Sequence, residues 1–190
     1  MREGMVGKII KYITSYLRLI FLKIKYGKKL ECKINSIKSV YVGKGVRIKI
    51  NPGYKLVLGE SVYLSDYCKL ECLSGDITIG NGTFFNDCCK IICFDKITIG
   101  DECLFGPNVG IYDHDHRFDI KDMLINKQGY TTKSIEIKSN IWIGANSVIT
   151  KGCIINKRVV IGANSLVKGI VKSDAVYGGV PIKLIKVIDK

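Results

Sequence analysis

The chain contains only three prolines, two histidines and one tryptophan among its 190 residues. So few prolines, together with 20 glycines, are not typical of a disordered region and indicate many tight turns. Lysines interrupt the N-terminal apolar residues and no small-residue cleavage site follows them, so we predict neither a membrane span nor a cleavable signal peptide. We expect a cytoplasmic protein with one domain and a substantial hydrophobic core.

Acidic residues are also scarce, because 17 Asp and Glu face 30 Lys and Arg. The net charge of +13 predicts an acidic partner, which is a phosphate-bearing cofactor, an anionic polysaccharide, nucleic acid or a membrane surface. The basic residues are spread along the chain without an aromatic–basic recognition motif, so we do not expect nucleic acid. The phosphate-binding patterns GxxxxGK(S/T) and GxGxxG are absent as well.

Cysteine is frequent, with eight residues, but no CxxC pair occurs. In a reduced cytosol cysteine behaves as a small hydrophobic residue. Cys68/Cys72 and Cys89/Cys93 share a four-residue spacing that would also fit halves of a zinc site. The repeats described below give a simpler explanation, so we predict no metal site.

Residues 1–35 are apolar, aromatic and basic, with nine Lys and Arg against two Glu. Large residues recur at helical steps of three and four, at Ile9, Ile13, Tyr16, Ile20 and Ile24. We predict a helix here and leave two roles open. It packs on the domain or on another subunit, or residues 1–30 lie as a basic amphipathic helix on the anionic inner face of a membrane.

A six-residue repeat dominates the chain from about Val40 onward. Large aliphatic residues occupy six consecutive steps of six at Ile137, Ile143, Ile149, Ile155, Ile161 and Val167. Four residues after each comes a small or β-branched residue, at Ile141, Ser147, Cys153, Val159, Ser165 and Val171. Upstream segments that start at Leu58, Ile79 and Ile99 align in the same frame. Three such units close one triangular coil, and the stacking of coils supplies the core.

The repeat also places the cysteines. Cys68 and Cys89 fall in the column of Val109 and Ser147, and Cys72 shares a column with Cys93. Cys103 falls where Val62, Thr83 and Ile141 fall. We therefore predict that Cys68, Cys89 and Cys103 fill the core.

The segments "IWIGANSVITKGCIINKRVVIGANSLVKG" (141–169) and "YGGVPIKLIK" (177–186) resemble the hexapeptide-repeat acyltransferases, particularly sugar O-acetyltransferases of the maltose, galactoside and nodulation-factor type. The resemblance covers about residues 40–186 and implies an all-β fold, a left-handed parallel β-helix over residues 36–178. The helical segment 1–35 precedes it, one long loop leaves it at 112–134, and a tail follows at 179–190. It also implies a homotrimer with active sites between subunits.

The resemblance further implies that acetyl-CoA donates an acetyl group to a sugar hydroxyl. The N-terminal helix is more similar to membrane-proximal members that acetylate surface polysaccharides, so the expected acceptor is a surface-polysaccharide or lipid-linked saccharide. An N-acetyltransferase acting on an amino sugar and a non-catalytic β-helix remain as alternatives. A β-helical carbonic anhydrase needs three zinc-binding histidines, and this chain has two.

The repeat frame breaks once, between Ile111 and Ile135, and both histidines lie in that break. Acetyl transfer to a hydroxyl needs a base near neutral pH, for which histidine is suited. Ungapped alignment of "PNVGIYDHDH" with the family pattern places the catalytic base at His116. His114 falls at a variable position and is expected to order the loop or face the substrate. The residues that could orient the imidazole are Asp113, Asp115 and Asp119.

The other expected site residues follow from the resemblance. On the acceptor side they are Asn86, Asp95 and Trp142, although a packing role for Trp142 is equally compatible. Backbone N–H groups near Gly144 and Ala145 would stabilise the oxyanion. Main-chain groups that would hold coenzyme A lie at Ala145, Ala163, Lys168 and Gly169. Its phosphates would pair with Lys183 and Lys186.

Overall fold

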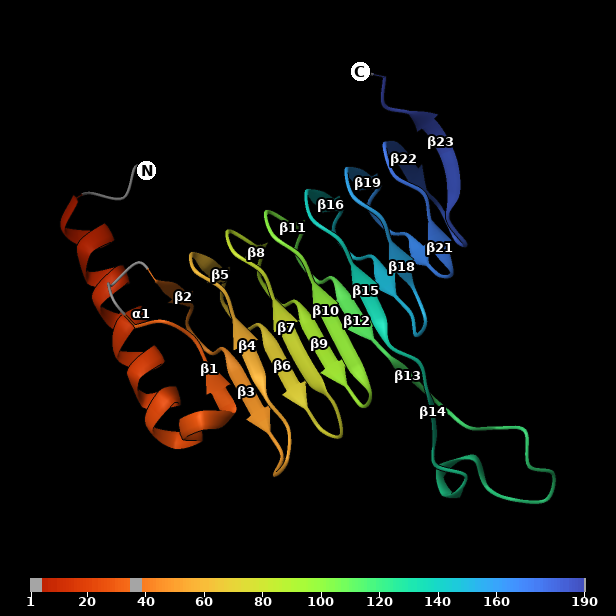
Figure 1. The fold of residues 1–190 in the computed structure, drawn as a ribbon, viewed down its shortest axis with the longest axis horizontal. Helices are drawn as coiled ribbons and strands as arrows, with labels where there is room; N and C mark the ends of the chain where they lie inside the picture. Colours follow the sequence, from red (N-terminus) through yellow and green to blue (C-terminus); the bar gives the residue numbers. More distant parts are fainter. Residues whose placement is uncertain (1–4, 35–38, 190) are drawn as a thin grey trace.

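Short strands wind around a three-sided prism in this computed structural model, which describes residues 5–34 and 39–189 (Figure 1). The chain passes from sheet A to sheet B to sheet C and then rises to the next coil. Adjacent strands of each sheet therefore come from successive coils and pair in parallel. The fold is the left-handed parallel β-helix that the resemblance implies, built from the triangular coils that the repeats predict.

Each sheet runs along one face of the prism. Sheet A contains β1 (Leu30–Glu31), β4 (Leu56–Leu58), β7 (Asp76–Ile79), β10 (Lys96–Ile99), β15 (Ile135–Ile137), β18 (Ile154–Ile155) and β21 (Ile170–Val171). Sheet B contains β2 (Val40–Val42), β5 (Val62–Leu64), β8 (Phe84–Phe85), β11 (Leu104–Phe105), β16 (Ile141–Ile143), β19 (Val159–Ile161), β22 (Ala175–Gly178) and the antiparallel β23 (Lys183–Val187). Sheet C contains β3 (Arg47–Ile50), β6 (Lys69–Cys72), β9 (Lys90–Cys93), β12 (Gly110–Tyr112), β17 (Val148–Ile149) and β20 (Leu166–Val167). We call the prism edges corners AB, BC and CA after the sheets that they join.

The strand register confirms the predicted columns. Leu58, Ile79, Ile99 and Ile137 are register partners in sheet A. Their side chains point inward and are at most 3% exposed. In β7 and β9, for example, alternate residues are buried because successive side chains of a strand point to opposite faces.

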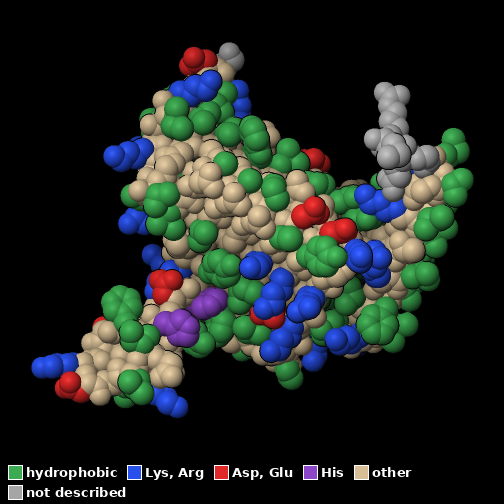
Figure 2. All heavy atoms as spheres, turned by 180° about the vertical axis from the view of Figure 1, so that it is seen from behind, with side chains coloured by type: hydrophobic (Ala, Val, Ile, Leu, Met, Phe, Trp, Pro, Cys, Tyr) green, Lys and Arg blue, Asp and Glu red, His purple; other side chains and the backbone are tan. Residues whose placement is uncertain are grey.

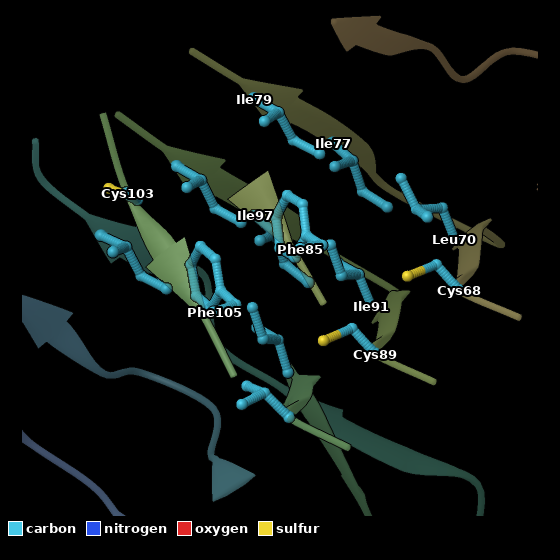
Figure 3. Packing of buried hydrophobic residues seen from close by; sticks show 14 of the residues in the cluster. Cys68, Leu70, Ile77, Ile79, Phe85, Cys89, Ile91, Ile97, Cys103 and Phe105 are labelled. Carbon is cyan, nitrogen blue, oxygen red and sulfur yellow. The ribbon is translucent and has the colours of Figure 1, made fainter. Parts of the chain in front are cut away.

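Large residues and cysteines interdigitate inside the prism (Figure 3). Phe85 and Phe105 stack from neighbouring coils with ring centroids 4.4 Å apart. Cys68, Cys89 and Cys103 are buried beside them, which confirms that these cysteines fill the core. Their small side chains fit close to the corners, where the interior of the prism narrows.

Helix α1 (Met5–Tyr26) covers the first coil of the prism (Figure 1). Its buried face consists of Ser15, Leu19 and Leu22. The Ser15 hydroxyl accepts a hydrogen bond from the Val42 backbone N–H at 2.7 Å, and the Tyr26 hydroxyl donates to a backbone carbonyl of β3. Burial of the two leucines contributes about 1.5–3 kcal/mol each.

The opposite face of α1 is apolar but faces away from the prism. Its exposed residues are Met5, Val6, Ile9, Ile10, Ile13, Leu17, Phe21 and Ile24. The segment predicted to be helical from its spacing of large residues, among them Ile9 and Ile13, is a helix. Ile9, Ile13 and Ile24, however, are exposed and do not contact the prism. No helix in the described residues is long and apolar enough to cross a bilayer.

The ends of the prism extend beyond the expected boundaries. Strand β1 begins at Leu30, directly after a 3₁₀ turn at Gly27–Lys29, so the last part of segment 1–35 already belongs to the first coil. At the other end the expected tail 179–190 contains β23, which folds back along β22 and lengthens sheet B.

One loop leaves the prism, at corner CA between the end of β12 and the start of β15. It contains a hairpin of β13 (His114–His116) and β14 (Tyr130–Thr132), with a 3₁₀ turn at Ile125–Lys127 (Figure 1). This is the extruded loop that the break in the repeat predicts.

Candidate active site

The β13–β14 hairpin places both histidines at the root of the extruded loop. His114 pairs with Thr132 and His116 with Tyr130 in an antiparallel register. The hairpin is tied to the coil behind it because Lys151 forms an ion pair with Asp115 at 3.1 Å and a hydrogen bond with Thr131. The two histidine side chains are therefore held next to corner CA.

Asp113 anchors the point where the chain leaves the prism. Its carboxylate is fully buried and accepts hydrogen bonds from the backbone N–H groups of Phe94 and Asp95, each at 2.8 Å. The Cys93 thiol donates to the same carboxylate at 3.2 Å. Because a buried charge needs several partners, this set fixes the corner from which the loop departs.

His114 lies in an aromatic enclosure and is only 15% exposed. Its ring packs 4.1 Å from the Phe94 ring and edge-on to Tyr130, with centroids 5.6 Å apart. Its Nδ1 atom is 3.4 Å from the Asp113 carboxylate. These contacts enclose the His114 ring at the root of the hairpin.

His116 has different surroundings because it lies farther from the prism and is exposed. Its ring packs against Tyr130 with centroids 4.7 Å apart. The three candidate carboxylates are all engaged elsewhere. Asp113 faces His114, Asp115 pairs with Lys151 and Asp119 pairs with Arg117 at 2.6 Å. Among the described residues of one chain, no carboxylate orients the His116 imidazole.

Asn86, Gly144, Ala145 and Ala163 share corner BC. Asn86 lies two coils before Gly144 and Ala145, and Ala163 lies one coil after them. Asn86 directly follows β8, and its side-chain oxygen accepts a hydrogen bond from the Asp87 backbone N–H at 2.8 Å. Its side-chain NH₂ group has no hydrogen-bond partner in residues 5–34 and 39–189. This donor is available to a ligand.

The backbone N–H groups of corner BC change character along the prism. In the first coils, each of these N–H groups donates a hydrogen bond to a carboxylate of the next coil. The Lys44 N–H donates to Asp66, and the Asp66 N–H donates to Asp87. Alanine occupies the later corners, and no acceptor in the described part of the chain meets the N–H of Ala145 or Ala163. These groups are available to a ligand, as the oxyanion and cofactor assignments require.

Gly144 keeps this corner open. It is buried, and a Cβ atom there would lie 2.4 Å from the Ala163 backbone nitrogen. Any larger residue at position 144 would therefore displace the backbone of Ala163, whose N–H group is free to bind a ligand.

Trp142 lies in the middle of β16 and points outward from sheet B, with 55% of its surface exposed. In register it lies between Leu104 and Val160. It belongs to an outward column of apolar residues along the whole sheet, whose members are Tyr41, Tyr63, Phe84, Leu104, Trp142, Val160 and Val176.

The remaining predicted residues lie elsewhere. Lys168 and Gly169 are exposed at corner CA, in the second coil beyond the hairpin root, and Asp95 is exposed at the same corner. Lys183 and Lys186 are exposed on β23. Within one chain the candidate residues therefore divide between corner CA, with His116, and corner BC, with Asn86 and Ala145.

Two features of the site were not predicted from the sequence. Tyr130 packs on both histidine rings, but it follows a long irregular loop and no spacing rule relates it to His116. The loss of carboxylate caps at Ala145 and Ala163 does have a sequence signal, because Asp66 and Asp87 occupy the equivalent corner positions of earlier coils.

Comparison with known proteins identifies relatives of the chain and of its fold. The bacterial transferase hexapeptide family (six repeats) matches residues 134–169. A Dictyostelium discoideum protein, provisionally named an acetyltransferase, is 32% identical over 130 residues, which are 68% of this chain and 67% of that protein. An Escherichia coli K12 protein, provisionally named a lipopolysaccharide biosynthesis O-acetyl transferase, is 32% identical over 119 residues. That match covers 59% of this chain and spans 61% of the relative's length.

Solved structures show the same fold. An N-acyltransferase from Bacillus cereus, crystallised with dTDP and coenzyme A, has a TM-score of 0.74 and 24% identity, covering 90% of this chain and 89% of that chain. A maltose O-acetyltransferase from Clostridium difficile has a TM-score of 0.57 and 26% identity, covering 94% of this chain and 89% of that chain. This chain belongs to the hexapeptide-repeat transferase family.

Proposed function

We propose that this protein transfers an acetyl group from acetyl-CoA to a hydroxyl of a saccharide. One observation carries the proposal. Both histidines of the chain lie on the hairpin that leaves the β-helix at its single break, and unused backbone donors lie at the next corner. The family membership and the acetyltransferase relatives support this chemistry.

His116 acts as the general base. Its imidazole takes the proton of the acceptor hydroxyl as the hydroxyl oxygen bonds to the thioester carbonyl carbon. The N–H of Ala145 stabilises the negative charge that develops on the carbonyl oxygen. When the carbon–sulfur bond breaks, the proton passes from His116 to the departing thiolate, so the imidazole returns to its neutral form.

The acyl donor lies along uncapped backbone. The thioester end of the donor lies at Ala145, and the N–H of Ala163 donates a main-chain hydrogen bond to its amide arm. Lys168 and Gly169 line the opposite border from corner CA. The exposed Lys183 and Lys186 of β23 meet its phosphates. Asn86 and Trp142 lie on the acceptor side, together with Asp95.

The site is built between two copies of the chain, in a cyclic trimer. His116 at corner CA and Asn86 at corner BC are separated by the width of sheet C, so one chain does not bring them together. A second copy of the chain would bring its corner BC to corner CA of the first. When this head-to-tail contact repeats and closes after three subunits, it yields three equivalent sites. The exposed apolar column of sheet B, with Leu104 and Trp142, fits such an interface.

The acceptor is a surface-polysaccharide or lipid-linked saccharide, and the protein works at the inner face of the membrane. The lipopolysaccharide-related name of the Escherichia coli relative supports this acceptor class. The outward apolar face of α1 supports peripheral association with the bilayer. Lys11, Arg18 and Lys25, seven residues apart, form a basic row along its flank.

The test is an acceptor screen with the full-length protein and acetyl-CoA, read by mass spectrometry of the products. We expect a mass gain of one acetyl group on a saccharide, in a form that mild base removes, as expected of an ester. A base-stable product on an amino sugar would instead indicate amide formation. If coenzyme A does not bind and no acceptor is acetylated, the chain is a structural β-helix.

A further inference from the structure

Three cations lie one above another on the outer face of sheet C. Arg47 of β3, Lys69 of β6 and Lys90 of β9 are direct register partners on successive strands. Their side chains point outward because the residues that follow them, at positions 48, 70 and 91, are buried. We call Arg47, Lys69 and Lys90 the basic ladder.

The basic ladder costs stability. Neighbouring strands are about 4.8 Å apart, and like charges directly opposite one another repel. Within the described residues only Lys69 has a carboxylate partner, Glu71 at 3.1 Å, whereas Arg47 and Lys90 have none. Sheet A on the same prism compensates its charges, for example through the ion pair of Lys55 with Glu31 at 2.6 Å.

The ladder connects the helical end of the molecule to the histidine hairpin. Arg47 lines an apolar groove of about 510 Å³ between α1 and the first coil, together with Arg18 and Lys25. At the other end Lys90 pairs with β12, whose last residue leads into the hairpin. Figure 2 shows Lys and Arg side chains gathered between the two histidines and the helical end.

The charge of the ladder reaches the root of the hairpin. Burial raises the pKa of Tyr112, the last residue of β12, and the Lys69 ammonium opposes that rise. The Lys69 ammonium would therefore also attract an anionic ligand that lies against the hairpin on the N-terminal side of the prism.

We propose that the basic ladder binds the diphosphate of the acceptor, so that the acceptor is a saccharide linked to a diphosphate. This inference rests on the proposed function and names its substrate class. The single Glu71 carboxylate leaves the three cations with a net positive charge, which two adjacent phosphates would balance. Guanidinium and ammonium groups both bind phosphate well. A neutral sugar would gain nothing from three aligned cations. The diphosphate belongs to a nucleoside diphosphate sugar or to a lipid-diphosphate saccharide.

The kinetic test compares Lys69→Gln/Lys90→Gln with a control, Lys96→Gln/Lys157→Gln, which removes two exposed lysines away from sheet C. We expect the ladder variant to raise the KM for a diphosphate-linked saccharide at least tenfold, with kcat within about twofold. The KM for the same saccharide without the diphosphate should not change. Equal loss on both acceptors, or equal behaviour of the two variants, would overturn the proposal.

The source of the diphosphate is decided by two arms of the same assay. One arm offers soluble nucleoside diphosphate sugars, and the other offers polyprenyl-diphosphate saccharides in neutral phosphatidylcholine vesicles. Selective loss with the ladder variant in either arm supports the ladder and identifies the source. A ladder variant that only loses binding to anionic vesicles indicates a membrane contact and contradicts the proposal.

A binding test separates this inference from the proposed function. Inorganic pyrophosphate is titrated calorimetrically into the full-length protein with saturating coenzyme A present, so that the cofactor's own phosphate sites are filled. We expect the ladder variant, but not the control, to weaken pyrophosphate binding at least fivefold. This result without any acetyl transfer would refute the proposed function and leave an anion site. Transfer with unchanged pyrophosphate binding would refute the ladder alone.

Discussion

His114 and His116 lie two residues apart, yet their surroundings differ, and we propose different roles for them. Phe94 and Asp113 reach His114 because it lies against the prism, whereas His116 is exposed and its only aromatic-ring contact in the described residues is with Tyr130. The proposed base must be reached by the acceptor hydroxyl, and His116 is exposed whereas the His114 side chain is only 15% exposed. We propose that His114 positions the hairpin through its enclosed ring.

Removal of the buried carboxylate at the loop root should destabilise the fold. Asp113→Ala leaves the N–H groups of Phe94 and Asp95 without an acceptor, and we expect a loss of about 2–3 kcal/mol in the free energy of unfolding. Urea unfolding followed by circular dichroism measures it. Asp115→Ala is the matched control and should cost less than about 1 kcal/mol, because its ion pair with Lys151 is exposed. Equal costs would show that Asp113 does not anchor the corner.

The buried thiols should make stability fall at alkaline pH. Burial raises the pKa of Cys72 and Cys153 to about 12 and that of Cys103 to about 11. Unfolded thiols ionise from about pH 8.5–9, so above that range the unfolded chain binds fewer protons than the folded one. Stability from this source is complete below pH 8.5 and declines as the pH rises toward the folded pKa values.

Cys153→Ala tests this linkage. Between pH 8 and pH 10.5 the free energy of unfolding of the wild type should fall by about 2 kcal/mol more than that of the variant. This is the effect of one thiol that is ionised only in the unfolded chain, over about 1.5 pH units. Chemical unfolding at the two pH values measures the difference. Parallel losses in both proteins would show that Cys153 does not remain protonated in the fold.

At the scale of elements, α1 has two apolar faces, and the sequence alone could not choose between them. The period of Ile9, Ile13 and Ile24 correctly predicts a helix. The prism instead contacts Leu19 and Leu22, because Ser15 on that face accepts a hydrogen bond from β2. That choice depends on the shape and free backbone groups of the first coil, which a helical pattern does not contain.

The two faces should respond differently to substitution. Leu19→Ala should lower the free energy of unfolding by about 2–5 kcal/mol because it leaves a cavity. Ile9→Gln/Ile13→Gln should keep stability within about 1 kcal/mol but abolish flotation with vesicles that contain anionic phospholipid. Urea unfolding and vesicle flotation measure both effects. Unchanged flotation of the double variant would remove the proposed membrane contact.

At the scale of the whole molecule, the repeat predicts the fold well because each hexad specifies one strand and one turn. The columns of Leu58, Ile79 and Ile99 and the break after Ile111 are confirmed. The candidate site is less predictable. No carboxylate in the described residues of one chain contacts His116, and no local pattern specifies the second copy that we propose to face it. Tyr130 follows a loop whose path no local rule fixes.

Mixing two inactive subunits tests whether the site spans two copies. His116→Ala and Asn86→Ala chains, co-expressed in equal amounts, should form trimers in which about a quarter of the sites receive both native residues. We expect about a quarter of wild-type activity from the mixture and almost none from either variant alone. Activity that stays at the level of the single variants would place both residues in one chain's site, and intact trimers by ultracentrifugation are the control.

The most direct test of the account is the turnover of His116→Ala with acetyl-CoA and the acceptor found in the screen. Loss of the general base should lower kcat by roughly two to four orders of magnitude, while the KM for acetyl-CoA changes little. His114→Ala should retain measurable activity in proportion to its folded fraction. Near-normal turnover of His116→Ala, together with an inactive but folded His114→Ala, would contradict the assignment.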